Sequence, residues 1–133
     1  MITGIGIDSI EIERIRAAIR RTPGLRERLF TPRELAQLPP PGKEASRLAT
    51  LFAGKEAVLK ALGTGLRGHS WQQVEIIHNQ AGKPQVALRD QALETARNLG
   101  ITKIHISLSH DQSHGQAFCI AEGGSFYDLV GDR

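Results

Sequence analysis

The chain contains very few of the residues that mark secreted, membrane or disulfide-stabilised proteins. Its 133 residues include one cysteine, one methionine, one tryptophan and one tyrosine. A single cysteine cannot form a disulfide within the chain, which favours a reducing compartment, and we expect the cytoplasm. No apolar run approaches the roughly 20 residues that a membrane-spanning helix needs, so we expect no membrane partner. The first residues reach Asp8 after one short apolar stretch, without a basic segment, which indicates a strand rather than a signal peptide.

Acidic residues are scarce in one region where arginine is abundant. Between residues 14 and 33 the only acid is Glu27, although the net charge of the whole chain is only +3. A basic patch of this kind raises the local concentration of acidic partners. Charge alone does not choose among a nucleic acid, an acidic protein and a phosphorylated metabolite. The patch consists of Arg14, Arg16, Arg20, Arg21, Arg26, Arg28 and Arg33.

Hydrophobic spacing and turn residues predict one domain over residues 1–122, followed by a C-terminal tail at 123–133. Gly4 and Gly6 lie in the first strand, where they should let another backbone come close. Helices mixed with short, hairpin-linked strands are typical of an α+β fold, here with a small antiparallel sheet packed with a long central helix and shorter helices. We expect strands at 2–8, 74–78, 84–88, 103–109 and 116–122, helices at 10–21, 44–62 and 90–99, and a short helix that starts after Thr31.

The helix predicted at 44–62 carries charges where a buried helix should have none. Its surface is apolar or small almost all round, which is typical of a helix in the protein interior. Lys55 falls in the large apolar arc, while Glu56 and Lys60 lie one turn apart on its edge. Burying a charge is costly unless the charge is paired or binds a metal. Two interpretations stay open: an exposed Glu56–Lys60 ion pair worth about 0.3–0.5 kcal/mol, or a functional site.

Three longer segments and two shorter ones carry a specific likeness. They are GIGIDSIEIERI at 4–15, FAGKEAVLKALGTG at 52–65 and ISLSHD at 106–111, with Ser70-Trp71 and Gly82-Lys83-Pro84 between them. In this order and at this spacing they resemble the holo-acyl-carrier-protein synthases, members of the phosphopantetheinyl transferase superfamily. The resemblance extends over about residues 2–122 and implies the phosphopantetheinyl transferase fold.

Two positions depart from the family pattern. The family often has arginine where this chain has Leu51, and alanine where it has Gly54. Position 51 therefore offers no contact to a phosphate. Gly54 should cost the helix up to ~1 kcal/mol relative to alanine.

The resemblance implies a Mg²⁺-dependent transfer from coenzyme A. A serine of an apo acyl carrier protein attacks the β-phosphate, takes the 4′-phosphopantetheine group and releases adenosine 3′,5′-bisphosphate. Asp8 and Glu56 match the metal positions of the family, and Mg²⁺ commonly takes one or two carboxylates as ligands. Glu56 is also a candidate to accept the serine proton. Taken alone, Asp8 equally suits the N-cap of the following helix.

The resemblance also assigns residues to catalysis and to coenzyme A binding. Lys60 matches a lysine that stabilises or protonates the leaving phosphate. Gly63, Thr64 and Gly65 match a segment near the nucleotide, although these residues equally suit a plain helix C-cap. His110 matches a contact to phosphate or to metal-bound water, while its strand phase also suits a histidine at the edge of the core.

The motif Ser109-His110-Asp111 has the composition of a catalytic triad but not its geometry. Neighbouring residues of a strand face opposite sides, so the three side chains cannot form the relay. Asp111 is instead a candidate third carboxylate near the metal ion.

The resemblance finally implies partners. Arg14 and Arg21 share a helix face that, in the family, docks the acidic helix of the carrier protein. Family members of this length are usually homotrimers with active sites between subunits. A nucleic-acid-binding domain is a competing function, but residues 10–29 contain no aromatic residue, so we expect no nucleic acid partner. A Mg²⁺-dependent hydrolase of a nucleotide or of coenzyme A would share the metal site and stays open.

Overall fold

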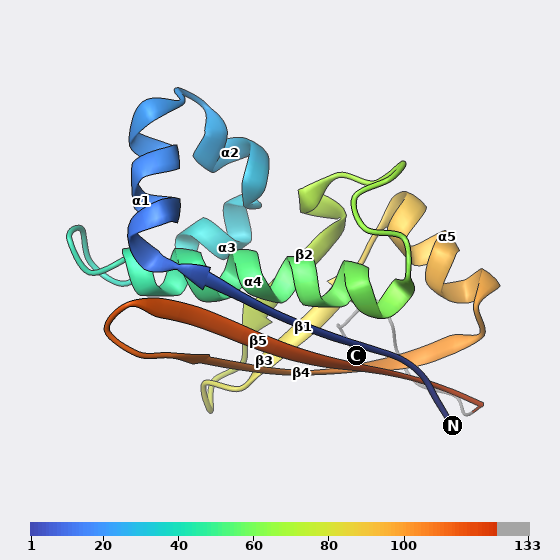
Figure 1. The fold of residues 1–133 in the computed structure, drawn as a ribbon. Coiled ribbons are helices and arrows are strands. Elements are labelled where there is room, and N and C mark those ends of the chain that lie inside the picture. The colour runs from blue at the N-terminus through green and yellow to red at the C-terminus, as the bar shows by residue number, and fades with distance from the viewer. Residues whose placement is uncertain (125–133) are drawn as a thin grey trace.

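Helix α4 (Ala45–Leu62) occupies the centre of the structure, a computed structural model that describes residues 1–124 (Figure 1). A sheet covers one side of α4, while the remaining helices and a β-hairpin lie on its other sides (Figure 1). The α+β fold predicted from the sequence is confirmed. The other elements are β1 (Ile2–Glu11), α1 (Ile12–Arg21), α2 (Leu25–Leu29), α3 (Pro32–Ala36), the 3-10 helix η1 (Trp71–Gln73), β2 (Val74–His78), β3 (Pro84–Leu88), α5 (Asp90–Asn98), β4 (Ile101–His110) and β5 (His114–Gly123).

The main sheet is antiparallel and has the strand order β1-β5-β4. In its register Asp8 lies opposite Ala117, and His110 lies opposite Gly115. Strands β2 and β3 do not join this sheet but form a separate two-stranded sheet. The predicted antiparallel strands are thus divided between two sheets, because a hairpin signal in the sequence does not say which further strands it will pair with.

The boundary between β1 and α1 differs from the prediction. The strand continues to Glu11, and α1 begins at Ile12 rather than at residue 10. Asp8 consequently lies inside the strand and does not cap the helix, since the N-cap position is Glu11. The register explains the extension, because pairing with β5 continues as far as Glu11 and His114.

Strand β1 packs directly onto the backbone of α4. A Cβ atom built on Gly6 would lie 1.8 Å from the carbonyl oxygen of Ala57, and one on Gly4 would lie 2.0 Å from that of Ala61. The expectation that Gly4 and Gly6 permit a close backbone approach is confirmed. This contact determines the depth at which Asp8, two residues after Gly6, sits against the helix.

Two short elements were not predicted, namely α2 and η1. Each has too few residues for a periodic pattern to show. Strand β5 extends to Gly123, the first residue of the predicted tail, and residues 125–133 of that tail lie outside the described residues. Within residues 1–124, no helix has the length and apolar character needed to cross a membrane.

Candidate active site

A groove of about 420 Å³ opens between β1, α1, α2, α4 and η1, and we call it the carboxylate groove. Strand β1 contributes Asp8 and α4 contributes Glu56, two acids that are 48 positions apart in the sequence. Arg14 of α1 lines the same groove. Part of the wall is aromatic, because the ring of Phe52, one turn before Glu56 on α4, packs against that of Trp71 with centroids 4.9 Å apart. The fold therefore brings three of the residues predicted from the sequence into one hollow.

Lys60 lies beside Asp8 rather than forming the predicted edge pair with Glu56. Its Nζ atom is 3.2 Å from Oδ1 of Asp8 and donates a hydrogen bond of 2.9 Å to the carbonyl oxygen of Ile7. A surface pair one helical turn apart was the simpler interpretation of the sequence. It is wrong because β1 crosses α4 at this turn and offers the ammonium group a closer carboxylate.

Glu56 and Asp8 influence each other across the groove. Partial burial raises the pKa of Glu56 above its ordinary value, and the charge of Asp8 raises it further, while Lys60 acts in the opposite direction. Two like charges in one partly enclosed space repel each other, so the pair favours a bound cation or proton.

The donor set fits Mg²⁺ better than a transition metal. Within residues 1–124, no cluster of three or more histidine, cysteine, aspartate or glutamate side chains is placed to hold a metal. Mg²⁺ does not need such a cluster, because it is commonly bound through one or two carboxylates with substrate phosphate and water completing the shell. Asp8 and Glu56 supply those two carboxylates.

The segment after Lys60 is a helix C-cap. Gly63 adopts the left-handed conformation with φ of 79°, and its N–H donates to the carbonyl oxygen of Lys60 at 2.9 Å. Thr64 donates through its N–H to the carbonyl oxygen of Leu59, and Gly65 is also left-handed. The cap interpretation is confirmed, and the contact of these residues with a nucleotide stays a prediction.

His110 lies away from the carboxylate groove of its own chain. It ends β4, and β5 separates β4 from β1 in the sheet. Its exposed side chain lines another hollow, of about 340 Å³, together with the basic residues Lys43 and Arg47 and with His78. The sequence motifs did not indicate that His110 would lie apart from Asp8 and Glu56 within one chain.

Asp111 does not join the two carboxylates. Its Oδ1 atom accepts hydrogen bonds from the backbone N–H groups of Ser113 and His114 at 2.8 and 2.7 Å. These bonds lower the pKa of Asp111 and hold the turn between β4 and β5. Within its own chain Asp111 therefore holds a turn, and its place as a third carboxylate near the metal ion stays a prediction.

The basic surface of α1 is exposed beside the carboxylate groove. Arg14 lines the groove, whereas Arg21 lies in the last turn of α1. Arg16 forms an ion pair with Glu13 on the same helix. The helix therefore presents positive charge at the entrance to the site, as a surface for an acidic partner requires.

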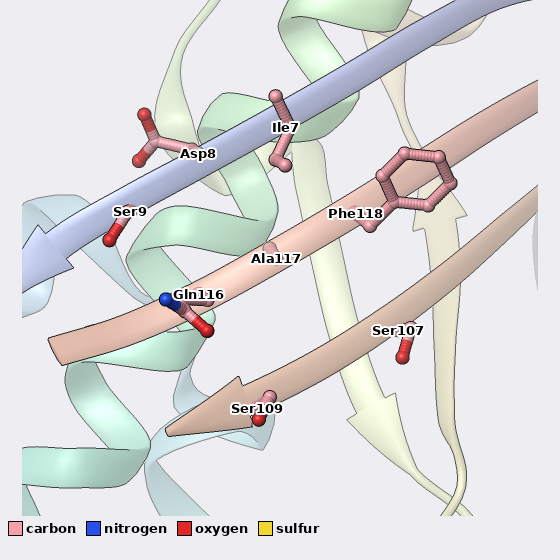
Figure 2. A pocket seen from close by; sticks show the side chains of 8 residues that line it. All are labelled: Ile7, Asp8, Ser9, Ser107, Ser109, Gln116, Ala117 and Phe118. Atoms are coloured by element: carbon pink, nitrogen blue, oxygen red, sulfur yellow. The ribbon is translucent and has the colours of Figure 1, made fainter. Parts of the chain in front are cut away.

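The outer face of the main sheet is more apolar than the sequence analysis anticipated. Figure 2 shows Ile7 and Phe118 on the face that turns away from α4, with Ser9 and Gln116 beside them. Ile7 is 64% exposed, Ile5 59% and Phe118 42%. The alternation of glycine with isoleucine at residues 4–7 was the available signal, since it places Ile5 and Ile7 on one face of the strand.

Comparison with known proteins gives one consistent result. A model of the 4′-phosphopantetheinyl transferase superfamily matches residues 4–121. The holo-[acyl-carrier-protein] synthase of Alkaliphilus metalliredigens is 46% identical over 121 residues, which cover 91% of this chain and 99% of that protein. The structure of the Neisseria meningitidis holo-[acyl-carrier-protein] synthase superposes with a TM-score of 0.80 and 38% identity, covering 92% of this chain and 99% of the other. The structure of the Helicobacter pylori synthase in complex with coenzyme A superposes with a TM-score of 0.77 and 28% identity, covering 89% of this chain and 99% of the other.

The family model spans most of the chain, and the chain belongs to the 4′-phosphopantetheinyl transferase superfamily. Within that superfamily the chain is similar to the holo-[acyl-carrier-protein] synthases, over nearly the whole length of those relatives. The resemblance that the sequence motifs predicted is thereby confirmed.

Proposed function

We propose that the chain transfers the 4′-phosphopantetheine group of coenzyme A to a serine of an apo acyl carrier protein and releases adenosine 3′,5′-bisphosphate. Family membership supports the reaction class. The observation that carries the assignment of the site is the meeting of Asp8 and Glu56 in a groove that also contains Arg14. We propose Mg²⁺ as the cofactor, with Asp8 and Glu56 as its protein ligands; when bound, Mg²⁺ neutralises charge on the pyrophosphate.

The residues of the chain have separate parts in this proposal. The serine oxygen forms a bond to the β-phosphorus while the bond from that phosphorus to the bridging oxygen breaks. Glu56 accepts the serine proton, directly or through water, in addition to binding the metal. Lys60 lies within reach of the groove beside Asp8 and stabilises the negative charge that develops on the leaving phosphate. Thr64 and its flanking glycines, which follow Lys60 in the chain, are proposed to contact the nucleotide.

We infer that copies of the chain assemble, as a homotrimer, through the outer face of the main sheet. Exposed isoleucine and phenylalanine side chains on one sheet face are typical of an interaction surface. Assembly also accounts for the position of His110, which lies across the sheet on β4, separated by β5 from the strand that lines the groove of its own chain. In the proposed assembly, His110 of one copy contacts coenzyme A bound in the carboxylate groove of the next.

The basic helix α1 docks the carrier protein in this proposal. Arg14 and Arg21 provide positive charge beside the site, and an acidic helix is the complementary partner. We also infer a cytoplasmic location, since Cys119 is a buried free thiol.

The test is incubation of the purified chain with coenzyme A, Mg²⁺ and an apo carrier protein, followed by mass spectrometry of the carrier. The expected result is a gain of one phosphopantetheine group that requires Mg²⁺. Absence of that gain with each of several carriers would contradict the proposal. Release of adenosine bisphosphate without modification of any carrier would favour the hydrolase alternative instead.

A further inference from the structure

The ammonium group of Lys55 is completely buried and has three partners. The side chain is 0% exposed, and Nζ lies 2.8 Å from Oε1 of Glu34, whose side chain is also 0% exposed. Nζ further donates hydrogen bonds to the carbonyl oxygens of Trp71 at 3.0 Å and Val74 at 2.5 Å. An ammonium group has three donors, so every donor of Lys55 is used.

Glu34 is bonded as completely as Lys55. Its Oε1 atom accepts a hydrogen bond of 2.8 Å from the N–H of Thr31, the reciprocal half of a capping box on α3. Its Oε2 atom accepts a bond of 2.8 Å from the N–H of Ile76 in β2. One ion pair therefore joins α3, α4, η1 and β2.

Stability alone does not account for such a pair. Desolvation of two charges costs several kcal/mol per ion, and replacing a buried pair by apolar residues is often neutral or stabilising. What a fully bonded buried pair provides is one fixed geometry, because any displacement leaves a buried charge unsatisfied. The role of the pair therefore depends on which part of the molecule it holds in place.

The pair fixes the aromatic wall of the carboxylate groove. Lys55 holds the backbone of Trp71, whose ring packs against Phe52. Both rings line the groove together with Glu56, the residue that follows Lys55 on α4. The same helical turn thus presents an acid to the groove through Glu56 and anchors Trp71 of the aromatic wall through Lys55.

We propose that the Lys55–Glu34 pair is a positioning element, which holds Trp71 of η1 at a fixed distance from Phe52 and Glu56 of α4 and so determines how the substrates lie in the groove. Neither residue of the pair touches a substrate. The inference rests on the proposed function of the carboxylate groove. The position of the wall can nevertheless be measured without any turnover.

The experiment removes both charges together, in the variant Lys55→Met/Glu34→Gln. Either substitution alone leaves one unpaired buried charge and is expected to destabilise the fold, whereas the double variant leaves none. Trp71 is the only tryptophan in the chain, so its fluorescence reports on the wall directly. The control is Glu94→Gln, which makes the same carboxylate-to-amide change at an exposed position of α5.

The expected result is a double variant that folds cooperatively while its wall is displaced. Quenching of Trp71 by acrylamide should rise at least about twofold, and kcat/KM for carrier modification should fall about tenfold or more, because small misplacements are costly to catalysis. The control should match the wild type in both measurements. A folded double variant with wild-type quenching and wild-type kcat/KM would overturn the proposal.

A second variant keeps the test decisive if the double variant does not fold. Glu34→Asp retains the charge and withdraws the carboxylate by one methylene, which should move Lys55 and raise quenching of Trp71. Unchanged quenching in this variant would also overturn the proposal. Should the wild type itself modify no carrier, the proposed function fails, while the quenching measurements still test the positioning of the wall.

Discussion

Glu56 is the single residue on which the proposed chemistry depends most. Glu56→Gln removes one metal ligand and the candidate base while keeping size and hydrogen-bonding capacity, so the fold should persist. We expect Mg²⁺-dependent carrier modification to fall by at least about 100-fold, the lower end of what positioned acid–base groups contribute. Mg²⁺ should raise the melting temperature of the wild type and leave that of the variant unchanged. The control is Glu94→Gln, in the exposed part of α5, and full activity of Glu56→Gln would remove Glu56 from the site.

Cys119 is a residue whose chemistry the fold suppresses. It lies at 0% exposure within β5, and burial raises the pKa of its thiol to about 12. Since the thiolate is the reactive form, the folded protein should not react with Ellman's reagent near pH 8. One thiol per chain should react once urea unfolds the protein. Rapid modification of the native protein would contradict this expectation.

Glu75 gives the folded state a dependence on acid. Burial by itself would raise the pKa of Glu75, but hydrogen bonds from Thr31 and Arg89, together with nearby arginine charges, lower it below its ordinary value. A lowered pKa means that the ionised form stabilises the folded state, and this contribution is lost as the pH falls below about 4.5. Glu75→Gln should therefore destabilise the protein at pH 7 and differ less from the wild type near pH 3. Urea unfolding at the two pH values measures the difference, and an equal difference at both would contradict it.

At the scale of elements, the contact between β1 and α4 should tolerate no added atom. Gly6→Ala places a methyl group 1.8 Å from the carbonyl oxygen of Ala57, and backbone atoms on both sides cannot move aside as a side chain would. We expect a loss of more than about 2 kcal/mol in unfolding free energy, measured by urea denaturation.

The packing of α4 against β2 and β4 explains its glycine. A Cβ atom on Gly54 would lie 2.5 Å from Cδ1 of Ile76, which is fully buried. Gly54→Ala should therefore lose more by crowding than the ~1 kcal/mol it gains in helix propensity. Ile76→Val removes the atom that clashes. The double variant should be more stable than the sum of the single effects by about 1 kcal/mol, and additivity in this cycle would contradict the contact.

At the scale of the whole molecule, the proposed assembly predicts complementation between copies. Glu56→Gln removes the groove acid and His110→Ala removes a residue that lies elsewhere in the same chain. If a site takes its residues from two copies, mixing the inactive variants after reversible dissociation should restore part of the activity. Restoration should require an intact sheet face, so adding Ile7→Glu to both variants should abolish it and give monomers in light scattering. If the mixed variants assemble but no activity returns, each site lies within one chain and the proposed assembly is contradicted.

Much of the fold was predictable because local signals and tertiary packing agree. Glycines and prolines mark the ends of α4 and the turn of the β2–β3 hairpin, and the Thr31 cap with Glu34 at the third helical position formed as its residues indicate. The continuation of β1 to Glu11 was not predictable, because it depends on pairing with β5, a strand more than 100 residues away. The separation of the β2–β3 hairpin from the main sheet is also a matter of tertiary pairing.

The sequence by itself determined the family, the chemical types of Asp8 and Glu56, and the anomaly of charges on a buried helix. Only the tertiary structure decided their partners. Asp8 and Glu56 share a groove because two glycines let β1 lie on α4. Lys60 pairs with Asp8, and Lys55 pairs with Glu34 from a helix that precedes it by 21 positions. Spacing along the chain indicates which side chains share a face of a helix or strand. The partner of a charged group is determined by tertiary packing, which brings distant residues within a few ångströms of it.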